Sequence, residues 1–576
     1  MNSSNTNPLP SSGFFSNKVW DDTLLILTMA VLAGCGLVYE YLLSHYAGRV
    51  LGVMESTIYA MIGLMIVAMG LGAFAARKIK CAFNGFVWLE LTIALLGSTA
   101  ILIIGGLIAF TQLLPQIVTE TYGLPPEVIA KGGLINQLNY IAFKTPYFFG
   151  LLLGFFIGME IPLIAKIREQ IHQKHLEHNL GTIYGADYLG AGAGAAIWVL
   201  FLLSIDISQA SAYTAALNLI AGLIFIARYW RNLKWLKTLL AMHLLLAVLI
   251  VSIFNHGNQW LNQMSNLLYL DKVVYNDKTR YQQLTFTERN MGQGNIVTNF
   301  YLNGRLQFSS SDEAIYHGYL VYPALAASAR QDKVLIIGGG DGLALRDLLA
   351  WQPEHVTLID LDEQLLALFK DPHAHLPNKL ANRISELNQD SLNDPRVDVI
   401  GADAFIAIDE LLSENRHFDT IIVDLPDPSH PDLNKLYSVN FYARLNQLLS
   451  ADGLITIQST SPYHAKESFI AIKNTVEASG FNHVEQYHDN VPSFGEWGWT
   501  VASKLGAKPS IRLKNLNQLP VDHNWLTLEM ILSAFHFPKE FYADKEEVGI
   551  NYLGSHKLYQ LHQKAWLDQH GSNTFN

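Results

Sequence analysis

The stretch Lys333-Val-Leu-Ile-Ile-Gly-Gly-Gly-Asp-Gly342 decides the fold of the second half of this chain. Its run of apolar residues predicts a strand that is buried on both faces, as in the centre of a parallel sheet. The glycines that follow let the backbone turn tightly beside a ligand of nucleoside size. We therefore interpret the stretch as a strand and a ligand-binding turn, followed by a helix over 343–351.

The spacing of the glycines helps to choose the ligand. Gly338, Gly340 and Gly342 form a G-x-G-x-G pattern, whereas a dinucleotide fingerprint needs another small residue at position 343, which is leucine. Asp341 within the turn also suits a cationic ligand better than a pyrophosphate. These features favour a sulfonium nucleoside of the S-adenosylmethionine type, although a plain strand-to-helix turn would use the same glycines.

The composition divides the 576-residue chain into an apolar first half and an acidic second half. Residues 1–254 carry 14 Lys and Arg against 12 Asp and Glu, whereas the remainder carries 25 against 38. The acidic half argues against a nucleic-acid partner and favours cationic ligands. Both cysteines, Cys35 and Cys81, lie in the apolar half, so the sequence indicates no disulfide framework.

Seven apolar runs long enough to cross a bilayer follow a polar segment, 1–20, that we expect to be disordered. The first run comes after two aspartates rather than a basic segment, which predicts a retained span and not a signal peptide. We therefore expect a seven-helix transmembrane domain over 21–254 in a lipid bilayer. The runs cover roughly residues 23–43, 56–76, 86–111, 142–164, 186–205, 210–227 and 237–254.

Carboxylates within these runs are candidate functional groups, because burying a charge in a membrane is costly. Glu40, Glu160 and Asp187 are such residues, although Glu160 and Asp187 could instead cap or pair near the end of a span. The glycines of segment 190–194 indicate close helix packing more often than a ligand site.

The basic loops conflict with the chemistry expected of the second half. They follow the second and fourth runs and separate the sixth from the seventh, so the positive-inside rule makes these loops cytoplasmic. Seven spans would then put the C-terminal domain outside, whereas a domain that consumes a cytosolic nucleoside should lie inside. Either a span is miscounted, for instance a re-entrant piece in 112–141, or the charge rule fails. We expect a cytoplasmic catalytic domain on the inner membrane.

Strands and helices alternate along the second half, after an amphipathic linker at 255–275. The turn Asn303-Gly304 between two strands predicts a small β-hairpin region. The alternation predicts an α/β doubly wound, Rossmann-like domain within 255–505. Residues 506–576 are expected to form a helical C-terminal extension, to which we assign no chemistry. A loop is expected from about 370 to 395, and strands at 333–337, 355–360, 397–400, 418–424 and 453–458.

Acidic residues follow the carboxyl ends of four predicted strands, where ligands of such sheets bind. They are Asp341, Asp360, Asp403 and Asp424, the last followed by Asp427. Converging carboxylates repel one another unless a cation lies among them; without metal-type His or Cys spacing an organic diamine is as plausible as a metal, and we predict no metal site. Asp360 could accept hydrogen bonds from ribose hydroxyls, Asp403 could accept from an adenine amino group, and Asp424 could deprotonate an attacking amine.

From about 275 to 505 the chain resembles the spermidine synthase (polyamine aminopropyltransferase) family, and its first half resembles the membrane-integrated bacterial branch. The order and spacing of the matching runs are far more specific than any single run. The runs are Tyr281-Gln282, Leu302-Asn-Gly-Arg-Leu-Gln307, Ser311-Asp-Glu-Ala-Ile-Tyr-His317, Gly338-Gly-Gly-Asp-Gly342, Asp360-Leu-Asp362, Asp403-Ala404, Asp424-Leu-Pro-Asp-Pro-Ser-His-Pro431, Leu436-Tyr437 and Phe441-Tyr442.

The resemblance implies transfer of an aminopropyl group from decarboxylated S-adenosylmethionine, a co-substrate and not a permanently bound cofactor, to putrescine or a related diamine. The products would be spermidine and methylthioadenosine, and a homo-oligomer is expected. Asp424 would be the proton acceptor, with Tyr316, His317, Asp341 and Asp427 at the polyamine. The thioadenosine would contact Gln282, Gln307, Gly338, Gly340, Asp360, Asp403, Ala404 and Pro431.

The chain departs from the family pattern mainly around the amine, so another diamine or a triamine acceptor stays open. The stretch Phe494-Gly-Glu-Trp-Gly-Trp499 could shape the amine pocket or pack in the core. The departures are Asp360 for the usual Glu, Gly318 for the Glu of a Tyr-His-Glu motif, His430-Pro431 for Gly-Pro, and Val491-Pro492 for a Tyr-Pro motif.

Two other functions stay open. A methyltransferase could use the same sheet, although the acidic site offers no group to pair with the carboxylate of S-adenosylmethionine. A membrane polyamine transporter or sensor could instead use Glu40, Glu160 and Asp187 as its path, with a second half that only binds.

Overall fold

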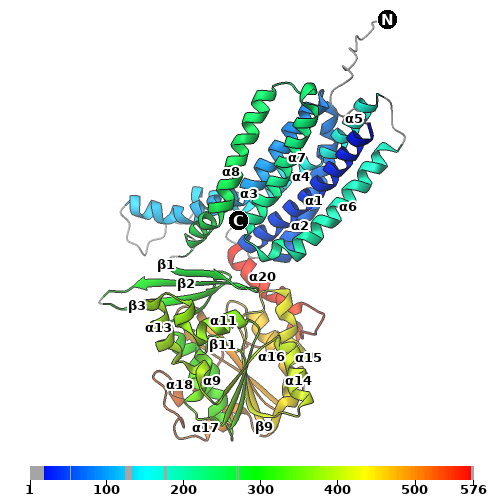
Figure 1. Cartoon of the computed structure of the whole chain (residues 1–576). Helices are drawn as coiled ribbons and strands as arrows, with labels where there is room; N and C mark the ends of the chain where they lie inside the picture. Colours follow the sequence, from blue (N-terminus) through cyan, green and yellow to red (C-terminus); the bar gives the residue numbers. More distant parts are fainter. Residues whose placement is uncertain are drawn as a thin grey trace. The chain divides into compact units, whose positions relative to one another are not determined.

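The computed structural model describes residues 18–51, 54–122, 133–173, 178–267, 269, 271–292 and 294–571. The chain divides into two compact units, Met1–Leu270 and Asp271–Asn576, and each is described by itself (Figure 1). The segment for which the sequence predicts disorder, 1–20, lies outside the described residues except for its last three, which are helical. Residues 123–132, in the segment where a re-entrant piece was one possibility, also lie outside them.

Long helices form the first unit. Within the described residues, seven helical stretches are long and apolar enough to cross a membrane, and one of them combines α4 and α5. The seven apolar runs are therefore helical, and α8 continues through part of the predicted linker. The helices are α1 (Lys18–Leu51), α2 (Met54–Ala75), α3 (Ala82–Thr121), α4 (Gly133–Ile157), α5 (Glu160–His172), α6 (Asn179–Leu200), α7 (Ile207–Tyr229) and α8 (Leu236–Asn266).

Glycines let α1 and α6 approach closely. A Cβ atom on Gly190 would lie 1.9 Å from the carbonyl oxygen of Ala30, and one on Gly194 would lie 2.5 Å from that of Gly34. A larger residue at either position would force the helices apart, which supports the packing role predicted for this segment.

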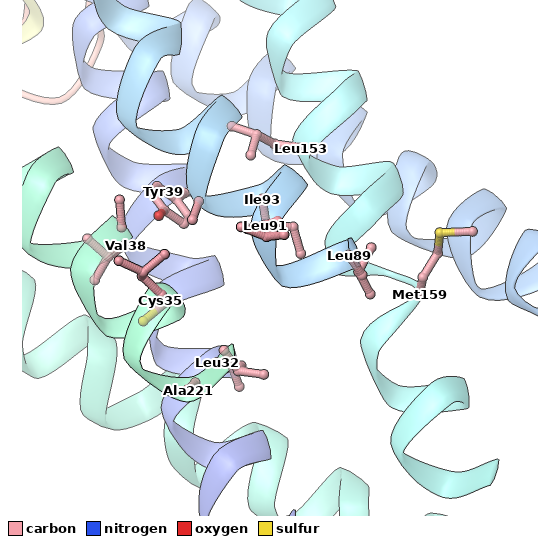
Figure 2. Packing of buried hydrophobic residues seen from close by; sticks show 14 of the residues in the cluster. Leu32, Cys35, Val38, Tyr39, Leu89, Leu91, Ile93, Leu153, Met159 and Ala221 are labelled. Atoms are coloured by element: carbon pink, nitrogen blue, oxygen red, sulfur yellow. The ribbon is translucent and has the colours of Figure 1, made fainter. Parts of the chain in front are cut away.

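Apolar side chains fill the interior of the first unit, and a few carboxylates lie among them. Figure 2 shows Tyr39 of α1, Leu91 of α3 and Leu153 of α4, all of which are buried. Glu90 of α3, which the sequence analysis overlooks, is also buried and accepts a 2.9 Å hydrogen bond from the side-chain amide of Asn218 on α7. This pair crosses the helix interface.

Of the carboxylates that the sequence singles out, Glu40 and Glu160 are buried and Asp187 is half-buried. Glu160 is the first residue of α5, at the point where the long stretch of α4 and α5 is interrupted. Glu160 therefore lies near a break in the helix. This position agrees both with a functional carboxylate and with a residue that caps or pairs near the end of a span.

A four-stranded antiparallel sheet begins the second unit. The predicted hairpin turn is present, and both Asn303 (φ 51°) and Gly304 (φ 80°) adopt the left-handed conformation that a tight two-residue turn requires. The strands are β1 (Lys272–Lys278), β2 (Gln283–Asn290), β3 (Ile296–Leu302) and β4 (Arg305–Ser309), paired in that order.

A seven-stranded mixed sheet forms the centre of the second unit, with the order β10-β11-β9-β8-β5-β6-β7. The strand that opens the sequence analysis, β5, lies between two parallel partners, as predicted. The antiparallel pair at one edge was not predicted, because its first strand mixes polar with apolar residues. The strands are β5 (Lys333–Gly338), β6 (His355–Asp360), β7 (Val397–Gly401), β8 (Phe418–Asp424), β9 (Leu449–Gln458), β10 (His483–Val491) and β11 (Gly495–Ser503).

Helices cover both faces of this sheet (Figure 1). Val334 and Ile336 of β5 pack with the helices of one face, whereas Leu335 and Ile337 pack with those of the other. Burial on both faces explains the uninterrupted apolar run of this strand. The first face carries α9 (Glu313–Ala327) and α10 (Leu343–Leu349), and the second carries α14 (Ala404–Ser413), α15 (Val439–Leu448) and α16 (Lys466–Ala478).

The segment from 370 to 395 is helical where the sequence predicts a loop. It contains α12 (Pro372–His375) and α13 (Asn378–Asn388), after α11 (Glu363–Lys370). Leu380, Ala381 and Ile384 are buried at helical spacing, so α13 is held by one narrow apolar face on an otherwise polar sequence. The loop prediction is wrong because the stretch has too few apolar residues to reveal this period.

The C-terminal extension is part of the second unit. The predicted helical pattern at 526–535 is largely α18 (Leu528–Ser533). The other helices of the extension are α17 (Pro509–Lys514), α19 (Lys545–Val548) and α20 (Lys557–Gly571). A 3-10 helix, η5 (Pro431–Tyr437), follows β8 and contacts α20.

Candidate active site

A cavity of about 320 Å³ lies at the carboxyl ends of the parallel strands. Of the predicted site residues, Pro431 does not line it; this residue lines an adjoining groove, which shares Asp403 and Lys435 with the cavity. The predicted residues that do line it are Gln282, Gln307, Tyr316, His317, Gly338, Gly340, Asp341, Asp360, Asp403, Ala404, Asp424 and Asp427.

The strand order gives the cavity two ends. β6 and β7 lie on one side of β5, whereas β8 and β9 lie on the other. Asp360 ends β6 and Asp403 follows β7, so we call their end the Asp360 end. Asp424 ends β8 and Asp427 follows it, so we call theirs the Asp424 end. Asp341 follows β5, between the two.

The glycine turn after β5 contacts the last residues of both neighbouring strands. Gly338 has a φ of +83°, and a Cβ atom there would lie 2.0 Å from the carbonyl oxygen of Asp424. A Cβ atom on Gly340 would lie 2.8 Å from Oδ2 of Asp360. Position 338 therefore requires glycine, whereas a side chain at position 340 would have to displace the carboxylate of Asp360, so the turn lies directly against both acidic residues.

At the Asp360 end, backbone amides hold the carboxylate of Asp360. The N–H of Gly340 donates to Oδ2 at 3.1 Å, and the N–H of Asp362 donates to Oδ1 at 3.0 Å. Burial raises the pKa of Asp360 to about 6, and these two hydrogen bonds offset part of the effect. A carboxylate has about four acceptor positions, so it can still accept from a ligand hydroxyl.

Asp362 positions Gln282 at the same end. Its Oδ2 accepts a 2.9 Å hydrogen bond from the side-chain amide of Gln282 and a 2.6 Å bond from the hydroxyl of Thr279. Its Oδ1 accepts from the first backbone N–H groups of α11 and caps that helix. Gln282 is thus tied to the start of a helix.

Asp403 has two partners. Its Oδ1 accepts a 2.9 Å bond from the N–H of Phe405 and caps α14, and its Oδ2 lies 2.5 Å from Nζ of Lys435. Lys435 is not among the residues expected at the site, and it lies 32 residues further along the chain in η5. An adenine amino group at Asp403 would have to share the carboxylate with this ammonium.

At the Asp424 end, the hydroxyl of Tyr316 on α9 donates a 2.7 Å hydrogen bond to Oδ1 of Asp424. Burial raises the pKa of Asp424 to about 6; His317 and Tyr316 act in the opposite direction, and Asp341 adds to the increase. A carboxyl group with this pKa is mostly ionised at neutral pH and can still accept a proton.

Three side chains donate to Asp427. The amide of Gln458 donates to Oδ1 at 3.0 Å, the hydroxyl of Thr460 donates to Oδ2 at 3.3 Å, and Nε2 of His562 lies 3.3 Å from Oδ2. Burial opposes ionisation of Asp427, but the bonds from His562 and Gln458 outweigh it and lower its pKa. Asp427 is therefore anionic, whereas Asp424 is poised to take up a proton.

Glu313 holds His317 from one turn earlier in α9. Nδ1 of His317 lies 2.9 Å from Oε2 of Glu313, and Arg346 of α10 donates to both oxygens of Glu313, at 2.8 and 3.0 Å. Burial disfavours the charged imidazole, but Glu313 raises the pKa of His317 overall. A cationic imidazole therefore lies beside Asp341 and Asp424.

Glu313 and Arg346 are absent from the candidates drawn from sequence. Glu313 lies four residues before His317 in a predicted helical run, and that spacing is a signal for an i,i+4 pair. No spacing could reveal Arg346, because α9 and α10 meet only in the folded chain.

The aromatic stretch 494–499 is divided between the cavity and the core. Phe494 and Trp497 line the cavity, whereas Trp499 is fully buried and stacks on Tyr319 at a ring distance of 5.2 Å. Core packing is therefore confirmed for Trp499, and the proposed role in shaping the amine pocket stays a prediction for Phe494 and Trp497.

Comparison with known proteins shows the family. Residues 313–515 match the spermine/spermidine synthase domain. Among solved structures, spermidine synthase from Thermotoga maritima aligns with 48% of this chain and 87% of its own, at 22% identity and a TM-score of 0.40.

Two relatives align over both units of the chain. A polyamine aminopropyltransferase from Shewanella oneidensis is 57% identical over 557 residues, which cover 96% of this chain and 97% of its own. A polyamine aminopropyltransferase 1 from Streptomyces coelicolor is 32% identical over 497 residues, which cover 85% of each. This chain therefore belongs to the polyamine aminopropyltransferase family and is an enzyme of that type.

Proposed function

We propose that the enzyme transfers the aminopropyl group of decarboxylated S-adenosylmethionine to putrescine, with spermidine and methylthioadenosine as products. The observation that carries this proposal is the meeting of Asp341, Asp424 and Asp427 in the cavity that Asp360 also lines. Acidic groups at this density suit a substrate pair that consists of a sulfonium ion and a diamine. Family membership leaves no support for the methyltransferase or for a purely non-catalytic transporter or sensor.

The Asp360 end would bind the nucleoside. Asp360 would accept hydrogen bonds from the ribose hydroxyls, and Asp403 would accept one from the adenine amino group. Gln282, Gln307, Ala404 and the turn glycines would contact the remainder of the thioadenosine, with Pro431 at the adjoining groove. The backbone amides that already bond Asp360 fix its direction before the ligand arrives.

The Asp424 end would bind the diamine. Asp427 and Asp341 would attract the ammonium group that does not react, and Asp424 would accept a proton from the attacking nitrogen. The nitrogen lone pair then forms a bond to the propyl carbon while the carbon–sulfur bond breaks and leaves its electron pair on sulfur. Catalysis would rest on alignment of the two reactants and on the base.

Tyr316 and His317 would support this chemistry from α9. The hydroxyl of Tyr316 fixes the orientation of Asp424, and its hydrogen bond favours the ionised carboxylate. The cationic imidazole of His317 offsets part of the repulsion between Asp341 and Asp424. The base would therefore be ionised without a metal ion in the proposed site.

We also propose that the first unit anchors the enzyme in the inner membrane, with the catalytic unit in the cytoplasm, and that the enzyme is a homo-oligomer. The seven apolar helices support the anchor. A cytosolic nucleoside as co-substrate supports the cytoplasmic side, against the distribution of basic loops. Fusion of a reporter to the C-terminus, active only in the cytoplasm or only in the periplasm, tests the orientation.

Purified full-length protein tests the reaction itself. It would be incubated with decarboxylated S-adenosylmethionine and with putrescine, cadaverine or spermidine, and the products would be identified by mass. We expect spermidine and methylthioadenosine from putrescine. Methylthioadenosine with a different amine as the better acceptor would correct the substrate, and no aminopropyl product with any amine would contradict the proposal.

A further inference from the structure

The C-terminal extension is anchored in the core of the catalytic unit. Asn551 is fully buried, and its side-chain amide donates to the carbonyl oxygens of Asn434 and Tyr437, at 3.2 and 3.0 Å. Leu558, at the start of α20, is also fully buried, among the apolar side chains of the second face of the sheet. The extension is therefore fixed directly to η5, the element that follows Asp427.

The extension also fills the space beside Gly318, the residue that follows His317 in α9. A Cβ atom on Gly318 would lie 2.7 Å from Cδ1 of Leu526 and 3.0 Å from the ring of His523, both in the extension. The Glu of the related motif would not fit at this position without a shift of the extension. The carboxylate partner of His317 is Glu313, one turn earlier in α9.

One side chain of α20 reaches the cavity wall. The side chain of His562 is only 1% exposed, and its Nε2 lies 3.3 Å from Oδ2 of Asp427. Because the carboxyl group of Asp427 is ionised, the imidazole donates this hydrogen bond. The side chain of Asp427 is 14% exposed, and this bond joins it to a residue 135 positions further along the chain.

The donors of Asp427 leave it limited freedom. Gln458, Thr460 and His562 supply three hydrogen bonds to a group with about four acceptor positions. The carboxylate cannot rotate without breaking bonds to β9, to the segment after β9 and to α20. Only one acceptor position is left for an incoming ammonium group.

We infer that His562 is a positioning residue for the amine substrate: it fixes the direction and the negative charge of Asp427, which binds the unreactive ammonium group. The inference rests on the proposed function, because it assigns the amine to Asp427. It gives the C-terminal extension a part in choosing the acceptor amine, and it leaves the base, Asp424, unaffected.

Two substitutions of His562 separate its hydrogen bond from its volume. His562→Met fills much of the same space without a donor, whereas His562→Gln keeps an N–H group. We expect His562→Met to raise KM for putrescine about 10- to 100-fold, as for loss of a hydrogen bond to a charged group, with kcat and KM for the nucleoside nearly unchanged. His562→Gln should recover most of the affinity.

Lys564→Ala is the matched control. Lys564 lies on the exposed side of α20, pairs with Glu467, and has 61% of its side chain exposed. Removal of the Lys564 side chain should therefore leave kcat, KM for putrescine and KM for the nucleoside unchanged. Thermal unfolding and binding of methylthioadenosine report whether each variant is folded. If His562→Met does not fold, His562→Asn, whose shorter amide does not reach Asp427, takes its place.

A second background tests whether the effect acts through Asp427. In Asp427→Asn protein, His562→Met should change KM for putrescine less than threefold, because the anion that it positions is already gone. An equal loss in both backgrounds, or wild-type KM in folded His562→Met protein, would overturn the inference. Failure of the proposed function looks different: the wild-type enzyme would then form no aminopropyl product at all.

Discussion

The two ends of the cavity hold their carboxylates by different kinds of group. At the Asp360 end, backbone N–H groups donate to Asp360 and Asp403, and Lys435 is the one side chain that also donates to Asp403 among the contacts described above. At the Asp424 end, side chains donate to Asp424 and Asp427, among them Tyr316. Backbone donors persist when side chains are substituted, whereas side-chain donors can be lost by a single substitution. The amine end should therefore change more readily than the nucleoside end.

Two departures from the family pattern, at Gly318 and at Val491-Pro492, agree with this difference, whereas His430-Pro431 adjoins the groove that shares Asp403. Gly318 follows the cavity-lining His317 and contacts His523 of the extension, Val491-Pro492 lie just before the cavity-lining Phe494, and His562 of the extension contacts Asp427. At the Asp360 end, Asp360 keeps a carboxylate and loses only one methylene relative to Glu. Substitutions at one end should thus affect the binding of one substrate and leave the binding of the other unchanged.

Asp424→Asn should have the largest effect, because it removes the proposed base and keeps the shape of the side chain. The amide oxygen can still accept the hydrogen bond from Tyr316. We expect kcat to fall about 100- to 10,000-fold, as for loss of a general base. Titration with methylthioadenosine should give wild-type affinity. Turnover above about a tenth of the wild-type rate would show that Asp424 is not the base.

Asp360→Asn tests the opposite end. The change removes the charge and replaces one acceptor oxygen by a donor, so ribose hydroxyls would lose part of their binding site. We expect the affinity for methylthioadenosine to fall about 10- to 100-fold. KM for putrescine at saturating nucleoside should stay within about threefold of wild type, since a factor of three is well under 1 kcal/mol. A larger change in KM for putrescine would show that the two ends are coupled.

Tyr316→Phe should shift the pH dependence of turnover. Asp424 must be ionised to accept a proton, so the rate should rise with pH through about 6, the pKa of Asp424. The bond from Tyr316 favours the ionised form; its removal therefore raises this pKa and moves the rise to higher pH. We expect a shift of roughly one pH unit and a loss of about tenfold or less at pH 7.

The measurement is kcat/KM for putrescine against pH, which reports the pKa values of the enzyme without bound amine, for wild type and Tyr316→Phe. Tyr319→Phe is a comparison within α9, since Tyr319 bonds Asp489 and not Asp424. An unchanged profile in Tyr316→Phe would mean that the hydroxyl does not act on the base.

The acidic residues of both ends could be predicted from sequence because they are fixed by local rules. Each follows an apolar strand, and the carboxyl ends of parallel strands meet at one edge of a sheet. Of the side chains that hold these carboxylates, the family resemblance supplied Tyr316, whereas three others could not be predicted. Lys435, Arg346 and His562 reach Asp403, Glu313 and Asp427 only through packing of elements distant in the chain.

The same limit applies to the fold. The strands β5 to β9 carry strong apolar runs and were located to within a few residues, whereas α13 and β10 carry mixed sequences whose pattern is set by one buried face. The extension was given no chemistry because a single histidine in a helix has no spacing to mark it. Its role depends on where α20 packs.

Lys435→Met should have the smallest effect, and it tests the assignment of Asp403. Lys435 is 38% exposed, and such partly exposed ion pairs contribute about 0–1 kcal/mol, so the unit should remain as stable as wild type. Removal of the ammonium leaves Oδ2 of Asp403 free to accept from the adenine amino group. The affinity for methylthioadenosine should therefore rise, by about threefold at most.

Methylthioinosine supplies the control, because its base presents a carbonyl oxygen where adenine has the amino group. A carboxylate repels that oxygen, whereas the Lys435 ammonium can donate to it. Lys435→Met should therefore weaken the binding of methylthioinosine and strengthen the binding of methylthioadenosine. A parallel change for both nucleosides would mean that Asp403 serves only to cap α14. Opposite changes would mean that the Lys435–Asp403 pair distinguishes adenine from hypoxanthine. One side-chain contact would then set the selectivity for the base, at an end where the other donors to Asp360 and Asp403 are backbone N–H groups.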